Sequence, residues 1–180
     1  MIRLIDNALL DEVSAEARAS ARGRKNRNFH TDDAQPGHRL LNAIEPGSYV
    51  APHRHLDPSK SETMVVLRGS MGLVTFDDAG EVVEATKVCG FAPSLASLGT
   101  ATSWRPAPSG LVSHGGTPMG VDIPAGTWHT VFALEPGTVF FEAKAGPYLP
   151  LTVDEKASWA PAEGDPGAPA YLARLAQLLN

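Results

Sequence analysis

The sequence has one cysteine, no long run of apolar residues and no excess of positive charge. Cys89 has no second cysteine to pair with, which excludes an internal disulfide. No stretch approaches the roughly 18 consecutive apolar residues of a membrane-spanning helix, so no membrane partner is expected. The net charge of −5 argues against a nucleic-acid partner, because such binders usually carry a positive surface. The first residues reach Asp6 before an apolar region develops, unlike a secretory signal, and we therefore expect a cytoplasmic location.

A length of 180 residues is typical of a single domain. Apolar residues near a 3.6-residue period, preceded by Asp6 as a suitable N-cap, predict a helix over about 5–21. Leucines at helical spacing predict a short closing helix over 170–179. We divide the predicted domain into an N-terminal helix and arm (1–30), a barrel (31–150) and a C-terminal tail and helix (151–180).

Short segments rich in β-branched and aromatic residues, separated by turn signals, predict eight strands between these helices. The predicted strands are 38–44, 49–53, 63–68, 72–76, 82–87, 120–123, 130–133 and 139–144. A sandwich, a jelly roll or a closed barrel are the economical arrangements of such strands. The segment 88–118, rich in Gly, Pro, Ser and Thr, is predicted to be an inserted loop that acts as a lid or a subunit contact.

Four side chains have the chemistry of metal ligands. His53 and His55 are two residues apart on a predicted strand, so both should leave the same face. Glu62 begins the next apolar run, where an antiparallel partner strand would return its carboxylate to the histidines. His129 begins a later strand. Three imidazoles and one carboxylate leave one or two positions open to water or substrate, and we predict one divalent transition metal ion there: iron, manganese, nickel or zinc.

These residues also resemble a known family. Gly47, His53, His55, Glu62 and Gly69 resemble the first motif of the cupin superfamily, and Pro124, Gly126 and His129 resemble the second. The stretch between His55 and Glu62 is longer than the family's common three or four residues, and Ala133 replaces the usual asparagine of the second motif. The resemblance implies an all-β cupin fold, a double-stranded β-helix or jelly-roll barrel, with a flanking N-terminal helix and a short C-terminal helix. Cupin barrels often pair, so a homodimer is also implied.

Further segments are similar to the WbuC-type cupin fold metalloproteins, which occur in bacterial surface-polysaccharide gene clusters and whose reaction is not established. The similar segments are 28–30, 39–42, 52–55, 126–130, 146–148 and 159–164. Our first hypothesis is a small-molecule metalloenzyme, isomerase-like, epimerase-like or oxygenase-like, and the resemblance implies that it acts on a sugar or sugar nucleotide. The alternative is a non-catalytic accessory protein whose metal orients or senses a bound carbohydrate. An acid or base beside the open metal position would favour the enzyme.

Six further residues are candidate ligand contacts, either because they lie in the WbuC-like segments or because they are expected to face the barrel interior. They are Asn28, His30, Arg39, Asn42, Tyr49 and Glu142. For several of these residues, structural hydrogen bonding is an equally good interpretation. The basic run 22–27 also has two interpretations, a solvated charged loop or a phosphate contact on an anionic ligand.

Overall fold

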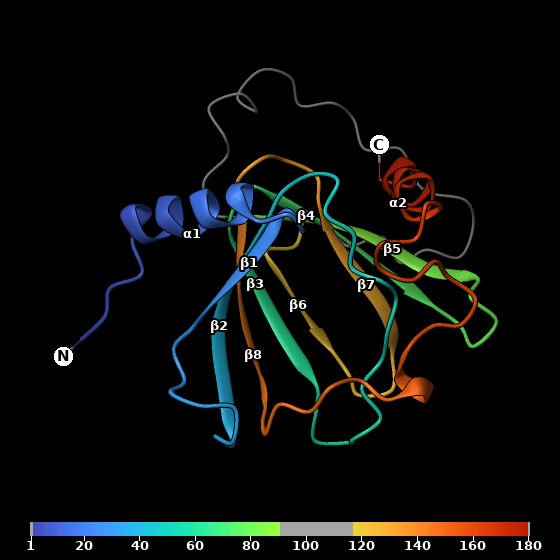
Figure 1. Cartoon of the computed structure of the whole chain (residues 1–180), viewed down its shortest axis with the longest axis horizontal. Coiled ribbons are helices and arrows are strands. Elements are labelled where there is room, and N and C mark those ends of the chain that lie inside the picture. Colours follow the sequence, from blue (N-terminus) through green and yellow to red (C-terminus); the bar gives the residue numbers. More distant parts are fainter. Residues whose placement is uncertain (1, 91–116, 180) are drawn as a thin grey trace.

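Two antiparallel β-sheets face each other in the computed structural model, which describes residues 2–90 and 117–179 (Figure 1). The larger sheet has the order β1 (Arg24–Asn28), β2 (Gly37–Ile44), β8 (Thr138–Ala145), β3 (Glu62–Arg68) and β6 (Gly120–Ile123). The smaller sheet has the order β5 (Val82–Cys89), β4 (Ser70–Phe76) and β7 (Trp128–Ala133). The chain changes sheet after β3, β5, β6 and β7. These crossings and the flanking helices confirm the predicted all-β barrel of the cupin type.

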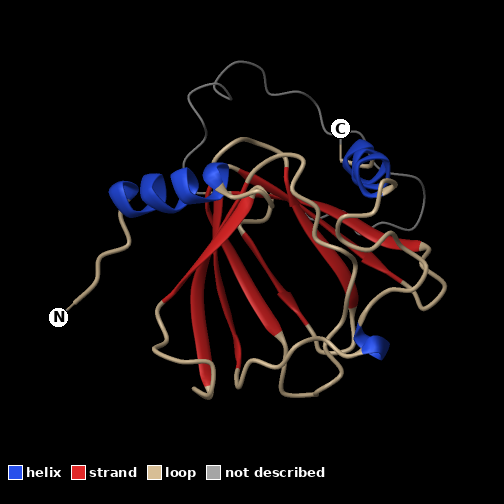
Figure 2. Cartoon of the chain, viewed as in Figure 1, coloured by secondary structure: helices blue, strands red, loops and turns tan. Residues whose placement is uncertain are grey.

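The two helices cover the outer faces of the sheets (Figure 2). Helix α1 (Asn7–Ala19) starts where Asp6 accepts a hydrogen bond of 3.0 Å from the Leu9 amide, as an N-cap should. Its buried residues pack on the larger sheet. Helix α2 (Ala168–Gln177) packs Leu172 and Leu175 on the smaller sheet. Neither of these helices, nor any other among the described residues, is long and apolar enough to cross a membrane.

The inner faces of both sheets share one apolar core. Its buried members are Ile44, Met64, Val66, Met71, Leu73, Val88, Ile123, Val131, Ala133 and Phe140. Side chains alternate along a strand, so β8 directs Phe140, Glu142 and Lys144 inward in turn. The register pairs Val66 with Phe140 and Glu62 with Lys144. The barrel interior is therefore apolar at one end and charged at the other.

Two segments differ from the sequence-based prediction. Strand β1 lies in the basic run 22–27, for which a charged loop was one of two interpretations, and it pairs with β2 along its full length. The predicted strand 49–53 is wrong, because the segment makes only isolated bridges. Pro52 has no amide hydrogen to donate to a continuous β-ladder. The Tyr49 carbonyl already accepts a hydrogen bond from the Arg24 guanidinium.

The predicted insertion 88–118 lies mostly outside the described residues. Its first two residues are strand instead of loop, because β5 continues to Cys89 and Val88 is fully buried in the core. At the other end, the Pro118 carbonyl accepts a hydrogen bond of 2.9 Å from the Cys89 amide. The predicted lid or subunit contact stays a prediction.

Candidate metal centre

His53 and His55 are held by a loop bonded to β7, in place of the strand expected from their spacing. The amides and carbonyls of His53 and His129 exchange two hydrogen bonds of 2.9 and 3.0 Å. The Gly126 amide donates to the His55 carbonyl at 2.7 Å, in a turn where Gly126 has a φ of +85° that favours glycine. Arg54 points the other way, with its guanidinium 4.3 Å from the centre of the Trp128 ring. The loop thus turns both histidines inward.

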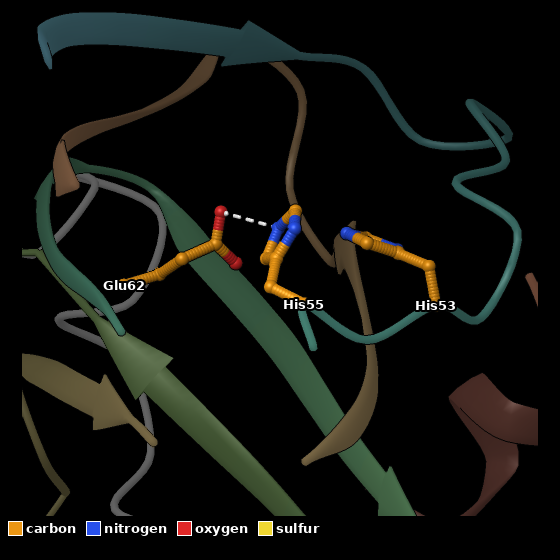
Figure 3. A group of neighbouring side chains, drawn as sticks. All are labelled: His53, His55 and Glu62. Atoms are coloured by element: carbon orange, nitrogen blue, oxygen red, sulfur yellow. Dashed lines mark hydrogen bonds and ion pairs between the residues drawn. The ribbon is translucent and has the colours of Figure 1, made fainter. Parts of the chain in front are cut away.

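Glu62 lies at the start of β3 and faces both of these histidines (Figure 3). One ligand atom from each of His53, His55 and Glu62 lies within 4.8 Å of the others. The Oε1 atom of Glu62 is 3.1 Å from His55 Nε2, and its Oε2 atom is 3.0 Å from His129 Nε2. The ring centroids of His53 and His129 are 4.5 Å apart. Fold geometry therefore gathers all four predicted ligands in one cluster.

Two atoms of this cluster have no hydrogen-bond partner among the described residues and are suited to bind a metal ion. Glu62 Oε2 and His129 Nε2 are buried without a hydrogen-bond partner, although they are 3.0 Å apart. They form no hydrogen bond with each other, and a buried polar atom without a partner costs about 1–3 kcal/mol. A cation between them would satisfy both atoms at once.

The other ring nitrogens of two histidines are already engaged. His53 Nδ1 lies 3.0 Å from the Ala51 carbonyl, and His129 Nδ1 lies 2.9 Å from the Thr127 carbonyl. A carbonyl can only accept, so each Nδ1 carries a proton, and in the neutral imidazole Nε2 is then the nitrogen with the lone pair. This arrangement fixes the tautomer and orientation that metal-ligating histidines need.

The protonation states also suit ligation. Burial lowers the pKa of His53 to about 3, and the neighbouring His129 adds to the effect. Burial alone would raise the pKa of Glu62, but contacts with His129 and His55 and the charge of Lys144 outweigh it and lower that pKa. Neutral imidazole and ionised carboxylate are the forms that bind metal.

A buried charge network extends from Glu62 along β8. Lys144 Nζ is 2.9 Å from Glu62 Oε1 and 2.6 Å from Glu142 Oε1. The Asn42 side-chain amide donates to the other oxygen of Glu142 at 2.5 Å. Burial raises the pKa of Glu142, although Lys144 acts in the opposite direction. Burial would lower the pKa of Lys144, but the charges of Glu142 and Glu62 raise it. Lys144 was missed in the sequence, although strand alternation from Glu142 would have found it.

These residues line one cavity of about 820 Å³. Its charged end contains His53, Glu62, His129, Glu142 and Lys144, and its walls include Asn42, Met64 and Phe140. Asn42 and Glu142 are thus the predicted ligand contacts that the fold brings to the candidate metal ligands.

The other four predicted contacts do not line this cavity. Tyr49 belongs to the outer cluster under α2 and donates its hydroxyl to the Pro161 carbonyl at 2.7 Å. His30 is buried against His38, with stacked rings 4.0 Å apart. Arg39 is exposed on β2, and Asn28 accepts a hydrogen bond of 2.8 Å from Asn26. Strand alternation failed for Tyr49 because its segment is not a strand.

Comparison with known proteins gives one family match and several structural likenesses. Residues 5–88 match a domain of unknown function, DUF6016, a span that includes His53, His55 and Glu62 but ends before His129. No curated protein sequence matches the chain.

Three solved structures illustrate the likeness in fold. KdgF from Halomonas sp. is 12% identical over 68% of this chain and 80% of its own, with a TM-score of 0.43. The polyketide cyclase RemF from Streptomyces resistomycificus is 21% identical over 73% and 74%, with a TM-score of 0.42. A variant of oxalate decarboxylase from Bacillus subtilis is 13% identical over 73% and 30%, with a TM-score of 0.43. The strand order of this chain and its inward-facing histidines and glutamate identify it as a cupin-type barrel with a candidate metal centre.

Proposed function

We propose that this protein is a metal-dependent enzyme of the WbuC type that acts on a sugar or sugar nucleotide in bacterial surface-polysaccharide biosynthesis, in the cytoplasm. The observation that supports catalysis is the pair Glu142 and Lys144, which lines the same cavity as His53 and His129 and contacts Glu62 through Lys144. A buried carboxyl that can hold or move a proton beside the candidate metal ligands can serve as a general acid or base, which catalysis needs and binding alone does not.

The proposed division of labour follows from these contacts. His53, His55, Glu62 and His129 would hold the ion, which supplies a Lewis acid for a carbonyl or hydroxyl oxygen of the substrate. Glu142 holds or moves a proton at Oε1, the oxygen that has no hydrogen-bond partner and lies 2.6 Å from Lys144 Nζ. Asn42 fixes the other oxygen, so the carboxyl cannot rotate away. Lys144, with its raised pKa, stays charged and stabilises negative charge nearby.

The size and polarity of the cavity support a small polar ligand. A volume of about 820 Å³ lies within the roughly 300–1,000 Å³ of small-molecule sites. The sugar assignment rests on the WbuC resemblance, and the carboxylate, amide and ammonium groups of the cavity are donors and acceptors for hydroxyl groups.

The test begins with elemental analysis of the purified native protein, which should show one transition metal ion per chain. The metal-loaded protein is then incubated with a panel of nucleotide sugars and sugar phosphates, and products are resolved by mass spectrometry and NMR. Glu142→Gln should abolish turnover and keep the metal, whereas Glu81→Gln, on an exposed turn, should change neither. Metal-dependent binding without turnover in the native protein would support the accessory alternative.

A further inference from the structure

The cavity has a second polar region, built by residues that metal binding does not use. Arg22, in the turn before β1, and Arg24, the first residue of β1, line it together with Glu163 of the C-terminal tail. Arg22 grips both oxygens of Glu163, with Nε 2.5 Å from Oε1 and Nη2 2.8 Å from Oε2. Arg24 Nη2 adds a third contact of 2.7 Å to Oε2. Two guanidinium groups therefore converge on one carboxylate that lines the cavity and is 42% exposed to solvent.

Arg24 is preorganised for this contact. Its Nη1 donates to the Tyr49 carbonyl at 3.0 Å and to Ser48 Oγ at 3.3 Å, and its side chain is only 18% exposed. Burial lowers the pKa of this guanidinium, while Glu163 acts to raise it. The orientation of Arg24 thus rests on partners other than Glu163 and survives its departure.

Positive charge is in excess in the lining of the cavity. Lys25 and Lys156 also line it, and neither makes an ion pair within the described residues. The lining thus has five basic residues (Arg22, Arg24, Lys25, Lys144 and Lys156) against three carboxylates (Glu62, Glu142 and Glu163), in a chain whose net charge is −5. A phosphate group carries more charge than a carboxylate and offers oxygens in the geometry that arginine binds through paired hydrogen bonds.

We propose that Arg22 and Arg24 form an anion subsite that binds a phosphate group of the ligand, and that Glu163 occupies this subsite until the ligand displaces it. The inference rests on the proposed function, because it takes the reacting end of the same molecule to lie at the metal centre. The proposed subsite restricts the substrate class to phosphorylated sugars, which are sugar phosphates or sugar nucleotides, and excludes free sugars.

Strand β1 provides an internal control for this proposal. Arg27 also contacts two carboxylates, Glu12 at 2.9 Å and Glu16 at 2.6 Å, but it does not line the cavity. Arg27→Ala and Glu16→Gln therefore repeat the chemical changes of Arg24→Ala and Glu163→Gln outside the subsite.

The experiment measures binding of inorganic pyrophosphate to the full metal-loaded chain by isothermal titration calorimetry. Arg24→Ala should weaken binding roughly tenfold or more, the usual loss for a charge-assisted hydrogen bond. Glu163→Gln should tighten it severalfold, because the competing charge is gone. The two control variants should bind as the native protein does. The same order should hold in a His53→Ala/His55→Ala background, where pyrophosphate cannot bind through the metal.

Two results would overturn the subsite. One is unchanged or weaker pyrophosphate binding in Glu163→Gln, a variant that removes no cation and so remains informative where Arg24→Ala fails to fold. The other is binding that disappears with the two histidines and is insensitive to Arg24. Weaker binding of inorganic phosphate than of pyrophosphate would support a sugar nucleotide, and equal binding would support a sugar monophosphate. Pyrophosphate binding that follows this pattern, without turnover of any phosphorylated sugar, would refute the proposed function and leave the subsite standing.

Discussion

Lys144 is the residue whose removal should most sharply reveal the charged end of the barrel. Its ammonium group lies between Glu62 and Glu142, and its side chain is 24% exposed. Lys144→Met keeps most of the side-chain volume and removes the charge, which leaves two buried carboxylates facing each other. Breaking a buried ion pair from one side costs about 3–5 kcal/mol. Because a quarter of the lysine is exposed to solvent, we take the lower end, about 3 kcal/mol.

In a chain of this length, 1 kcal/mol corresponds to about 2–4 °C in Tm, so metal-free Lys144→Met should melt about 6–12 °C lower than the native protein. A bound divalent cation replaces the missing positive charge beside Glu62, so the loss should be smaller in the metal-loaded protein. By linkage, the variant should also bind the metal more tightly.

Differential scanning calorimetry with and without a chelator measures both losses. Lys60→Met is the matched control, since Lys60 donates to the Pro147 carbonyl on the exposed surface, and it should change stability by less than about 0.5 kcal/mol. The coupling between Lys144 and the candidate metal ligands would be falsified by either of two results. One is a loss of stability in Lys144→Met no larger than that in Lys60→Met, and the other is a loss that bound metal does not reduce.

Three further predictions concern the metal ligands and the tail. The His53→Ala/His55→Ala variant should lose stoichiometric metal, measured by elemental analysis, while its far-UV circular dichroism stays native because the core is apolar; unchanged metal content would show that the ligands lie elsewhere. Glu62→Gln should bind metal more weakly and with less pH dependence, because the carboxylate must be deprotonated to ligate; native affinity across the pH range would argue against ligation by Glu62. Hydrogen bonds from the backbone of Thr152 and Leu56 lower the pKa of Glu155 to about 2. Its stabilisation is present above the usual value of 4.5 and disappears as the pH falls towards 2, so Glu155→Gln should flatten the decline of Tm in that window, and an identical decline would contradict this.

The local pattern of the chain was enough to predict the two helices, seven of the eight strands and the identity of the clustered histidines and glutamate. Period and capping depend on near neighbours: Asp6 caps the first helix from three residues away, and alternation marks β3 and β8 as strands with a buried face. The candidate metal ligands could be named because the His-x-His pair, the glutamate and the later histidine carry a recognisable chemistry at recognisable spacings.

Contacts between segments that are distant in the sequence determined the remaining features of the fold and of the candidate site. Strand β1 is polar and carries no apolar alternation, and it is a strand because β2 offers it a complete edge. The loop at His53 faces inward because of two backbone hydrogen bonds to His129, 76 residues away in the sequence, and not because of its own periodicity. Lys144 meets Glu62 through the register of β3 and β8, and Arg22 meets Glu163 across 141 residues. These contacts are determined by the register of the strands and by the points where the chain crosses between the sheets. No local pattern of residues encodes the register or the crossings, because both depend on which strand edges remain available when the sheets assemble.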